Sequence, residues 1–216
     1  MNIHGIFPPV TTPFDDQDSI DLAAFKANLS RLLRSGIRGV VVLGSNGEAP
    51  MLGEDEGVRL VAAAREVVPR DRLLIAGAGE ESTPATIAGA RRLAGAGADA
   101  VLVRTPAYFK TQLTQDVFVR HFTAVADASP VPVIMYNAAP FTGVSLLPPA
   151  VARLAEHRNI VGIKETSPDI AQVTEFVSVT PPDFQVVVGS LPTLYASLCV
   201  GAVGGIVAGA NVVPDL

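Results

Sequence analysis

The alternation of short apolar runs with helix-forming segments constrains the fold of this chain more than any other feature. Eight runs rich in β-forming residues lie at 6–10, 39–43, 73–76, 100–103, 131–136, 160–164, 184–188 and 203–208. Seven segments with helical periodicity lie between them, at 21–34, 54–68, 84–94, 115–128, 148–156, 170–179 and 192–200. Strands that are apolar on both faces and alternate with helices predict a parallel sheet covered by helices.

The number and spacing of these runs predict an α/β fold, a (β/α)8 TIM barrel. An open doubly wound sheet is the alternative, but eight evenly spaced strands favour closure. No linker or low-complexity tract divides the chain, so we expect one domain over residues 1–216. The sequence ends shortly after the eighth run. We therefore expect a barrel without its closing helix, and an open, apolar slot between the first and seventh helical segments.

Composition narrows the possible partners. Charged residues make up 17% of the chain, against roughly 25% in an average soluble domain, which indicates that sister subunits cover part of the surface. A net charge of −5 argues against nucleic acid. The uncharged stretch 189–214 is interrupted by proline and glycines, so we interpret it as core and not as a membrane span. A single cysteine and the lack of a visible secretory signal predict a cytoplasmic protein.

Lys164 is the strongest catalytic candidate. It ends the apolar run 160–164, which places its amine at the C-terminal end of a buried strand, where such barrels carry their active sites. Burial lowers the pKa of a lysine and yields a nucleophilic amine that can form an imine with a carbonyl. The alternative is a structural lysine that pairs with Glu165 or Glu48.

Other strand ends supply compatible groups. The glycine-rich turn 44–48 follows the second strand, and its N–H groups could hold a small carboxylate or phosphate, although glycine-rich turns follow most barrel strands. Tyr136 ends the fifth strand beside the sixth, where it could exchange a proton with a substrate, although a tyrosine there can equally be a core ring. Gly189 and Ser190 follow the seventh strand, where barrels often bind anions. The three histidines lie far apart in the sequence and predict no zinc site.

Five ordered motifs together resemble the dihydrodipicolinate synthase / N-acetylneuraminate lyase family of class I aldolases. They are GIFPPVTTPF at 5–14, GSNGE at 44–48, Thr105-Pro106 with Tyr108, Tyr136-Asn137 with Thr142-Gly143, and GIKE at 162–165. The resemblance extends over essentially the whole chain. It implies a Schiff base between a lysine and pyruvate or a pyruvate-yielding 2-oxo acid, with no metal or organic cofactor, because the imine itself is the electron sink.

The resemblance also assigns roles to residues. The lysine that forms the Schiff base matches Lys164, the general acid/base matches Tyr136, and the hydroxyl that links it to solvent matches Ser45. The residues that match substrate-binding positions are Ser45, Asn46, Thr166 and Ile206. Gly189 and Ser190 are added to this predicted site because of their position after the seventh strand. Tyr108 matches a tyrosine that a neighbouring subunit supplies, so the resemblance implies a homo-oligomer, a dimer or tetramer.

Differences from some members of the family and similarities to others indicate the branch to which the chain is closest in appearance. Phe141 stands where lysine-biosynthesis synthases carry an arginine, and Ala107 replaces one of their paired tyrosines. The segments 76–83 and 183–186 look most like 4-hydroxy-2-oxoglutarate aldolases, so we expect cleavage of that 2-oxo acid to pyruvate and glyoxylate. The alternatives are dihydrodipicolinate synthase, a lyase of the 2-keto-3-deoxygluconate or sialic acid type, and a catalytically silent pyruvate-binding barrel. A phosphate- or flavin-binding barrel would leave Lys164 without a role.

Overall fold

The computed structural model, which describes residues 1–215, contains one sheet of eight parallel strands in the order β1-β8-β7-β6-β5-β4-β3-β2. The strands are β1 (Gly5–Phe7), β2 (Gly39–Val42), β3 (Leu73–Gly77), β4 (Ala100–Arg104), β5 (Val133–Asn137), β6 (Ile160–Glu165), β7 (Gln185–Val188) and β8 (Gly204–Ile206). The sheet closes because Arg38 N donates to Ile6 O at 3.0 Å and Val41 N donates to Pro8 O at 3.0 Å. These bonds join β1 to β2 and confirm the barrel, so the open sheet is excluded.

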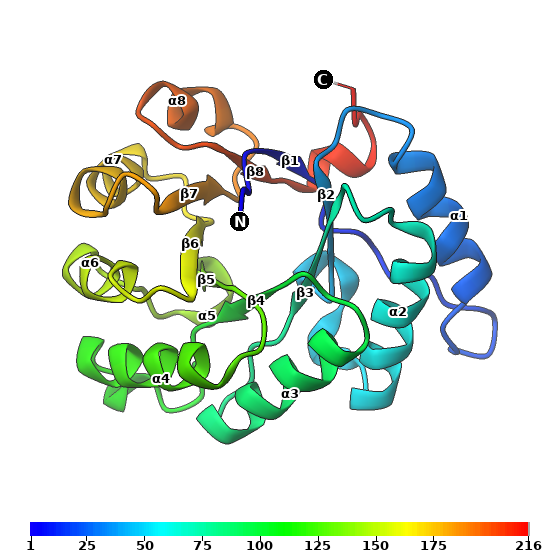
Figure 1. The fold of residues 1–216 in the computed structure, drawn as a ribbon, viewed down its shortest axis with the longest axis horizontal. Coiled ribbons are helices and arrows are strands. Elements are labelled where there is room, and N and C mark those ends of the chain that lie inside the picture. The colour runs from blue at the N-terminus through cyan, green and yellow to red at the C-terminus, as the bar shows by residue number, and fades with distance from the viewer. Residues whose placement is uncertain (216) are drawn as a thin grey trace.

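Helices surround the barrel (Figure 1). They are α1 (Leu22–Leu32), α2 (Glu54–Val67), α3 (Thr83–Gly95), α4 (Gln115–Ala128), α5 (Ala139–Thr142), α6 (Pro148–Ala155), α7 (Ile170–Val179) and α8 (Leu194–Cys199). Within residues 1–215, four 3₁₀ turns follow strands: η1 (Ser45–Gly47), η2 (Ala49–Met51), η3 (Lys110–Gln112) and η4 (Ala208–Asn211). Each of the seven predicted helical segments has a counterpart, while α5 was not predicted because one turn is too short to show a period.

Side-chain caps explain where several helices begin. The carboxylate of Asp21 accepts a hydrogen bond from Ala24 N, and Thr114 and Asp169 do the same for α4 and α7. Each cap satisfies one of the N–H groups that the first helical turn leaves without an intrahelical partner.

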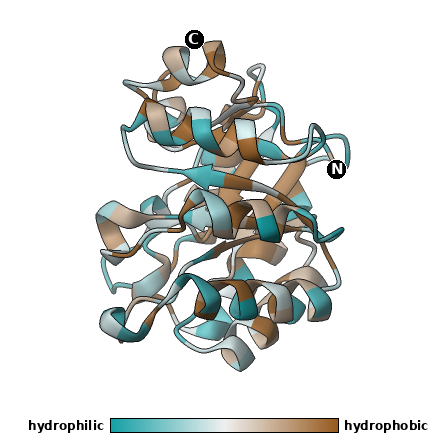
Figure 2. Ribbon diagram, turned by 90° about the vertical axis from the view of Figure 1, so that its left-hand side faces the viewer, coloured by the Kyte–Doolittle hydropathy of each residue, from teal (hydrophilic) through white to brown (hydrophobic). Residues whose placement is uncertain are grey.

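Two apolar layers hold the structure together. The larger layer lies between the sheet and the helices and includes Leu29, Leu60 and Phe122. The smaller fills the barrel interior and includes Phe7 and Ile134. Figure 2 shows the resulting pattern, with hydrophobic strands at the centre and hydrophilic residues on the outer helices. A barrel of this size is a packed core and not a pore, so ligand access is limited to its ends.

Some predicted boundaries were wrong at the ends of the chain. We predicted a first strand over 6–10, but β1 ends at Phe7, because Pro8 and Pro9 have no N–H to continue the ladder. We predicted an eighth strand over 203–208, but β8 ends at Ile206 and η4 begins at Ala208.

The slot expected between the first and seventh helical segments corresponds to the space between α1 and α8. η4 lies there (Figure 1), and Arg31 Nη2 donates to Asn211 O at 3.3 Å. Leu198, Val212 and Val213 are exposed apolar side chains in this region. Within residues 1–215, no helix combines the length and apolarity that crossing a membrane requires.

Candidate active site

Lys164 and Tyr136 meet inside the C-terminal end of the barrel. The two residues are directly paired across β5 and β6, so their side chains leave the sheet on the same face. Lys164 is 5% exposed and Tyr136 is 6% exposed. The Lys164 ammonium position lies 4.2 Å from the centre of the Tyr136 ring. The pairing of two neighbouring strands therefore brings together the candidate nucleophile and the candidate proton donor.

The amine of Lys164 is held in an environment that favours its neutral form. Burial lowers the pKa of Lys164, and its charge and hydrogen-bond interactions with Tyr136 partly oppose this effect. Within residues 1–215, Lys164 makes no ion pair. The interpretation of Lys164 as a structural lysine paired with Glu165 or Glu48 is therefore wrong.

The turn after β2 lies next to the phenol. Ser45 Oγ is 3.5 Å from Tyr136 OH. In the described part of the chain, the N–H groups of Ser45 and Asn46 donate no hydrogen bond, so both remain available to a ligand anion. Leu43 and Glu48 flank this turn in the left-handed region, each with a φ of 58°. Such strain in non-glycine residues is tolerated where the surrounding structure enforces it.

The end of β7 leaves room beside the lysine. A Cβ atom on Gly189 would lie 2.6 Å from Thr166 Oγ1 and 2.9 Å from Lys164 Cε, so only glycine fits here without displacing these groups. Thr166 Oγ1 is buried and has no hydrogen-bond partner within residues 1–215. An unpaired buried hydroxyl is costly and points to a missing polar ligand. Ser190 follows Gly189 and is half-buried.

Ile206 extends the apolar wall of the site. It ends β8 and belongs to the same interior cluster as Tyr136. A role for Ile206 in lining the substrate site stays a prediction.

Tyr108 is not brought to the site by its own chain. It is 78% exposed on the loop after β4, and its ring packs edge-on against Phe109. Glu81 anchors this loop: its Oε2 accepts from Ala107 N and Tyr108 N, each at 2.8 Å. Burial opposes the ionisation of Glu81, but these bonds and Arg104 outweigh it and lower its pKa. The structure therefore shows a firmly held loop with a projecting tyrosine.

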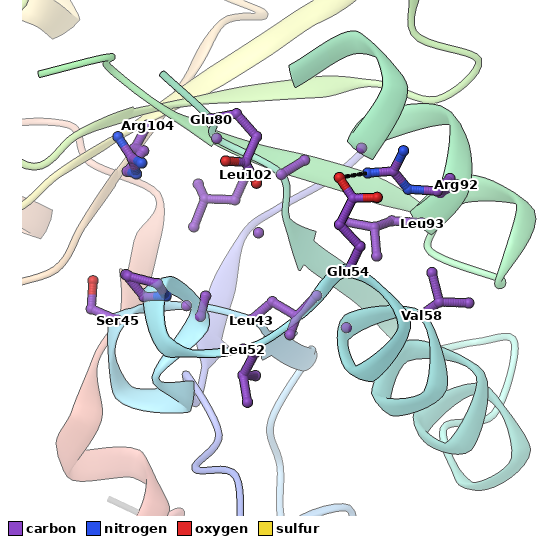
Figure 3. Close-up of a pocket in the computed structure, with 18 of the residues that line it drawn as sticks. Leu43, Ser45, Leu52, Glu54, Val58, Glu80, Arg92, Leu93, Leu102 and Arg104 are labelled. Carbon is purple, nitrogen blue, oxygen red and sulfur yellow. Dashed lines mark ion pairs between the residues drawn. The ribbon is translucent and has the colours of Figure 1, made fainter. Parts of the chain in front are cut away.

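A cavity of about 200 Å³ opens from this region outward between α2 and α3 (Figure 3). Ser45 and Tyr136 line it near the barrel, and Arg92 pairs with Glu54 at 3.0 Å on its helical side. Lys164 is not among its lining residues. The cavity thus adjoins the phenol of Tyr136 and the hydroxyl of Ser45.

A polar cluster on the outer face of β5 and β6 was not predicted from the sequence. Asn137 Nδ2 donates to Glu165 Oε2 at 2.6 Å, and Gln172 Nε2 donates to the same atom at 3.1 Å. Asn137 and Glu165 are completely buried. The available signal was their position, because each polar residue directly follows a site residue at the end of an apolar strand.

Known proteins are similar to this chain over nearly its full length. The model of the dihydrodipicolinate synthetase family matches residues 2–216. The 4-hydroxy-tetrahydrodipicolinate synthase of Haloarcula marismortui is 38% identical over 216 residues, which are 100% of this chain and 70% of the relative. The synthase of Xanthomonas campestris is 39% identical over 215 residues, with 100% and 70% coverage.

Solved structures show the same fold. The dihydrodipicolinate synthase of Bacillus anthracis superposes with a TM-score of 0.94 at 32% identity, over 99% of this chain and 72% of that one. A prophage protein of the same family from E. coli, solved in complex with pyruvate, gives the same TM-score, identity and coverage. The family model, the sequence relatives and the shared barrel together show that this chain belongs to the dihydrodipicolinate synthetase family.

Proposed function

We propose that this chain is a class I aldolase that binds pyruvate as an imine on Lys164. The observation that carries the proposal is the buried, unpaired amine of Lys164, which lies 4.2 Å from the Tyr136 ring. The amine adds to the C2 carbonyl of pyruvate, and the carbinolamine loses water to give the imine. The protonated imine withdraws electrons from C3, so a C3 proton can leave and an enamine can form.

The surrounding residues have complementary roles in this proposal. Tyr136 transfers protons at the imine and the substrate hydroxyl, and Ser45 connects its phenol to solvent. The free N–H groups of Ser45 and Asn46 hold the pyruvyl carboxylate, while Ile206 forms the apolar wall. Thr166, with Gly189 and Ser190, contacts the part of the substrate beyond C3.

The exposed loop with Tyr108 supports a shared site in a homo-oligomer, either a dimer or a tetramer. Tyr108 is 78% exposed and, within residues 1–215, its hydroxyl makes no hydrogen bond. In an oligomer it would enter a neighbouring copy and extend the proton relay from Tyr136. Light scattering beside an activity assay tests this point, because an active monomer would contradict the shared site.

Two candidate reactions of the pyruvate imine are supported by different observations. The names of the relatives support condensation of pyruvate with aspartate semialdehyde, the reaction of 4-hydroxy-tetrahydrodipicolinate synthase. The comparisons support this reaction better than the 4-hydroxy-2-oxoglutarate cleavage that the sequence analysis favoured.

Cleavage of 4-hydroxy-2-oxoglutarate remains the second candidate because of Phe141 and Thr166. Phe141 is 67% exposed where an arginine would grip a substrate carboxylate, and Thr166 Oγ1 lacks a partner. In this reaction the imine accepts the electron pair of the breaking C3–C4 bond, Tyr136 takes the C4 hydroxyl proton, and glyoxylate leaves. The enamine is then protonated and hydrolysed to pyruvate.

Borohydride trapping with pyruvate tests the imine. The chain has three lysines, Lys26, Lys110 and Lys164, so intact mass and peptide mapping locate an adduct without ambiguity. We expect one reduced pyruvyl group on Lys164, its loss in Lys164→Ala, and its retention in Lys110→Ala. An adduct on Lys26 or Lys110, or no adduct on folded protein, would contradict the proposal.

Assays of both reactions with the unmodified protein then identify the second substrate. Condensation with aspartate semialdehyde would support the synthase, and glyoxylate release would support the lyase. Trapping with neither activity would indicate a pyruvate-binding barrel that is catalytically silent.

A further inference from the structure

Glu165 is a completely buried carboxyl group next to Lys164 in the chain. Asn137 pairs with Glu165 across β5 and β6, one register position beyond the pair formed by Tyr136 and Lys164. Because side chains alternate along a strand, Tyr136 and Lys164 point into the barrel while Asn137 and Glu165 point toward the helices. The two pairs therefore lie on opposite faces of the sheet, at the C-terminal ends of the same two strands.

The partners of Glu165 are all hydrogen-bond donors. Oε2 accepts from Asn137 Nδ2 and Gln172 Nε2, at 2.6 and 3.1 Å, and Oε1 accepts from Ser167 N at 2.6 Å. The amide of Asn137 cannot turn over freely, since its Oδ1 accepts from Leu146 N at 2.9 Å. An acceptor-only group is required at this position, and the ionised carboxylate is such a group.

Burying a carboxylate costs free energy, and the position of Glu165 indicates its role. Burial raises the pKa of Glu165, and the hydrogen bonds to Ser167 and Asn137 counteract this effect. In the described residues no cation pairs with it. Its three donors come from β5, from the loop after β6 and from α7, so the carboxylate joins three segments that surround the amine.

We propose that Glu165 is a positioning residue for the imine chemistry, which fixes the ends of β5 and β6 so that Tyr136 stays in proton-transfer geometry with Lys164. This inference rests on the proposed function. Through Ser167 N, Glu165 also holds the segment that carries Thr166 beside the amine. Proton transfer is sensitive to such placement, since a displacement of about 1 Å can slow a reaction about 10²-fold.

Glu165→Gln tests the inference with little change in volume. In either orientation of the new amide, its NH₂ group meets another hydrogen-bond donor, which is either Ser167 N–H or the amides of Asn137 and Gln172. Two quantities are measured: the fraction of chains that trap pyruvate with borohydride, and the rate at which pyruvate methyl protons exchange with D₂O, followed by NMR. In exchange, a C3 proton leaves the imine, its electron pair forms the enamine, and a deuteron returns.

We expect Glu165→Gln to trap pyruvate with the same stoichiometry as the parent protein, and to exchange protons about 10²-fold more slowly per trapping site. Normalising to trapping sites removes the effect of partial unfolding. A purely structural role would lower the number of sites and leave the rate per site unchanged, and that result would overturn the proposal.

Asp99→Asn is the matched control. Asp99 is also a carboxylate that joins strands, because its Oδ2 accepts from Leu74 N and from Arg65 Nη1, both at 2.8 Å, but it lies at the opposite end of the barrel. We expect this variant to lose stability while its exchange rate per site stays at the parent value. If Glu165→Gln does not fold, Gln172→Ala removes one donor and leaves the carboxylate. A fall of about threefold or more per site, the scale of one net hydrogen bond, is then expected, and an unchanged rate would overturn the inference.

The parent protein separates this inference from the proposed function. If it forms no adduct on Lys164, both proposals fail. If it traps and exchanges normally while Glu165→Gln matches it per site, only the positioning role fails.

Discussion

The two ends of the barrel differ in which buried polar groups have partners. At the N-terminal end of the strands, Asp99 pairs with Arg65 at 2.8 Å. Asn159 Nδ2 donates to the carbonyls of Ala126, Ser129 and Val131 at 2.9 to 3.3 Å. These contacts tie loops to strands and satisfy groups that folding removes from water.

At the C-terminal end, polar groups remain without partners. Within residues 1–215, Lys164 has no ion pair, and Thr166 Oγ1 and Ser167 Oγ are buried without a hydrogen bond. The contrast has one exception on each side, because Arg65 Nε at the N-terminal end is also buried without a hydrogen bond, and Glu165 at the C-terminal end is fully bonded. The C-terminal end differs in that two of its unpaired groups, Lys164 and Thr166, lie together beside Gly189. The unpaired groups at the C-terminal end therefore lie where a ligand would supply the missing partners.

The largest effect is expected from Lys164→Met. Pyruvate trapping should vanish, while the melting temperature should rise by about 2–4 °C, which corresponds to about 1 kcal/mol in a domain of this size. The reason is that the buried amine costs free energy in the native state. Calorimetry measures the shift, and a less stable variant would show that native contacts already compensate the amine.

Lys164→Met also tests how the stability of the parent protein depends on pH. Burial lowers the pKa of Lys164 in the folded state, so the unfolded chain binds more protons between the two pKa values. Stability of the parent protein therefore rises with pH in that interval. We expect the gap between Lys164→Met and the parent to narrow as pH approaches about 10.4, the ordinary pKa of lysine.

Tyr136→Phe should have the next largest effect. Turnover and methyl-proton exchange should fall by about 10²–10⁴, the usual consequence of losing a general acid/base. Because Tyr136 raises the pKa of Lys164, its removal should move the acid limb of pyruvate trapping to lower pH. Tyr195, which is 81% exposed on α8, provides the control Tyr195→Phe, for which the parent profile is expected. An acid limb that moves to higher pH would contradict the assigned interaction.

The smallest effect on chemistry is expected at the N-terminal end of the strands. Asn159→Ala should lower the free energy of unfolding by about 1–3 kcal/mol, since it leaves acceptors unsatisfied, and should leave trapping per folded chain unchanged. Denaturant unfolding measures the first quantity and borohydride trapping the second. Asn28→Ala, on the exposed surface of α1, should stay within about 0.5 kcal/mol of the parent. Impaired trapping in folded Asn159→Ala would contradict the expectation that this residue affects stability and not the site at the other end of the barrel.

Much of the fold was predictable because local periodicity records burial. Apolar runs on both faces identified all eight strands, and helical periodicity identified seven helices. Boundaries failed at Pro8 and Ala208, where a missing N–H and a tight 3₁₀ turn end the ladder. α5 gave no periodic signal at all.

The site was predictable only in part. The position of Lys164 at a strand end, and the motifs around Ser45 and Tyr136, pointed to the residues that the structure brings together. The pairing of Asn137 with Glu165 and Gln172 could not be predicted, because hydrogen-bond partners depend on strand register and on the approach of α7. The sequence also offered Glu165 as a partner of Lys164, which the alternation of side chains across the strand rules out.

By itself, the sequence determined the barrel, its order of strands and helices, and the residue types available at each strand end, because hydrophobic periodicity and turn chemistry are local properties of the chain. Only the tertiary structure decided that Lys164 has no ion pair, that Gly189 leaves space beside Thr166, and that a buried carboxylate supports the two strands from behind. These features arise from contacts between segments distant in sequence, and their energies depend on the burial and distances that closure of the barrel imposes.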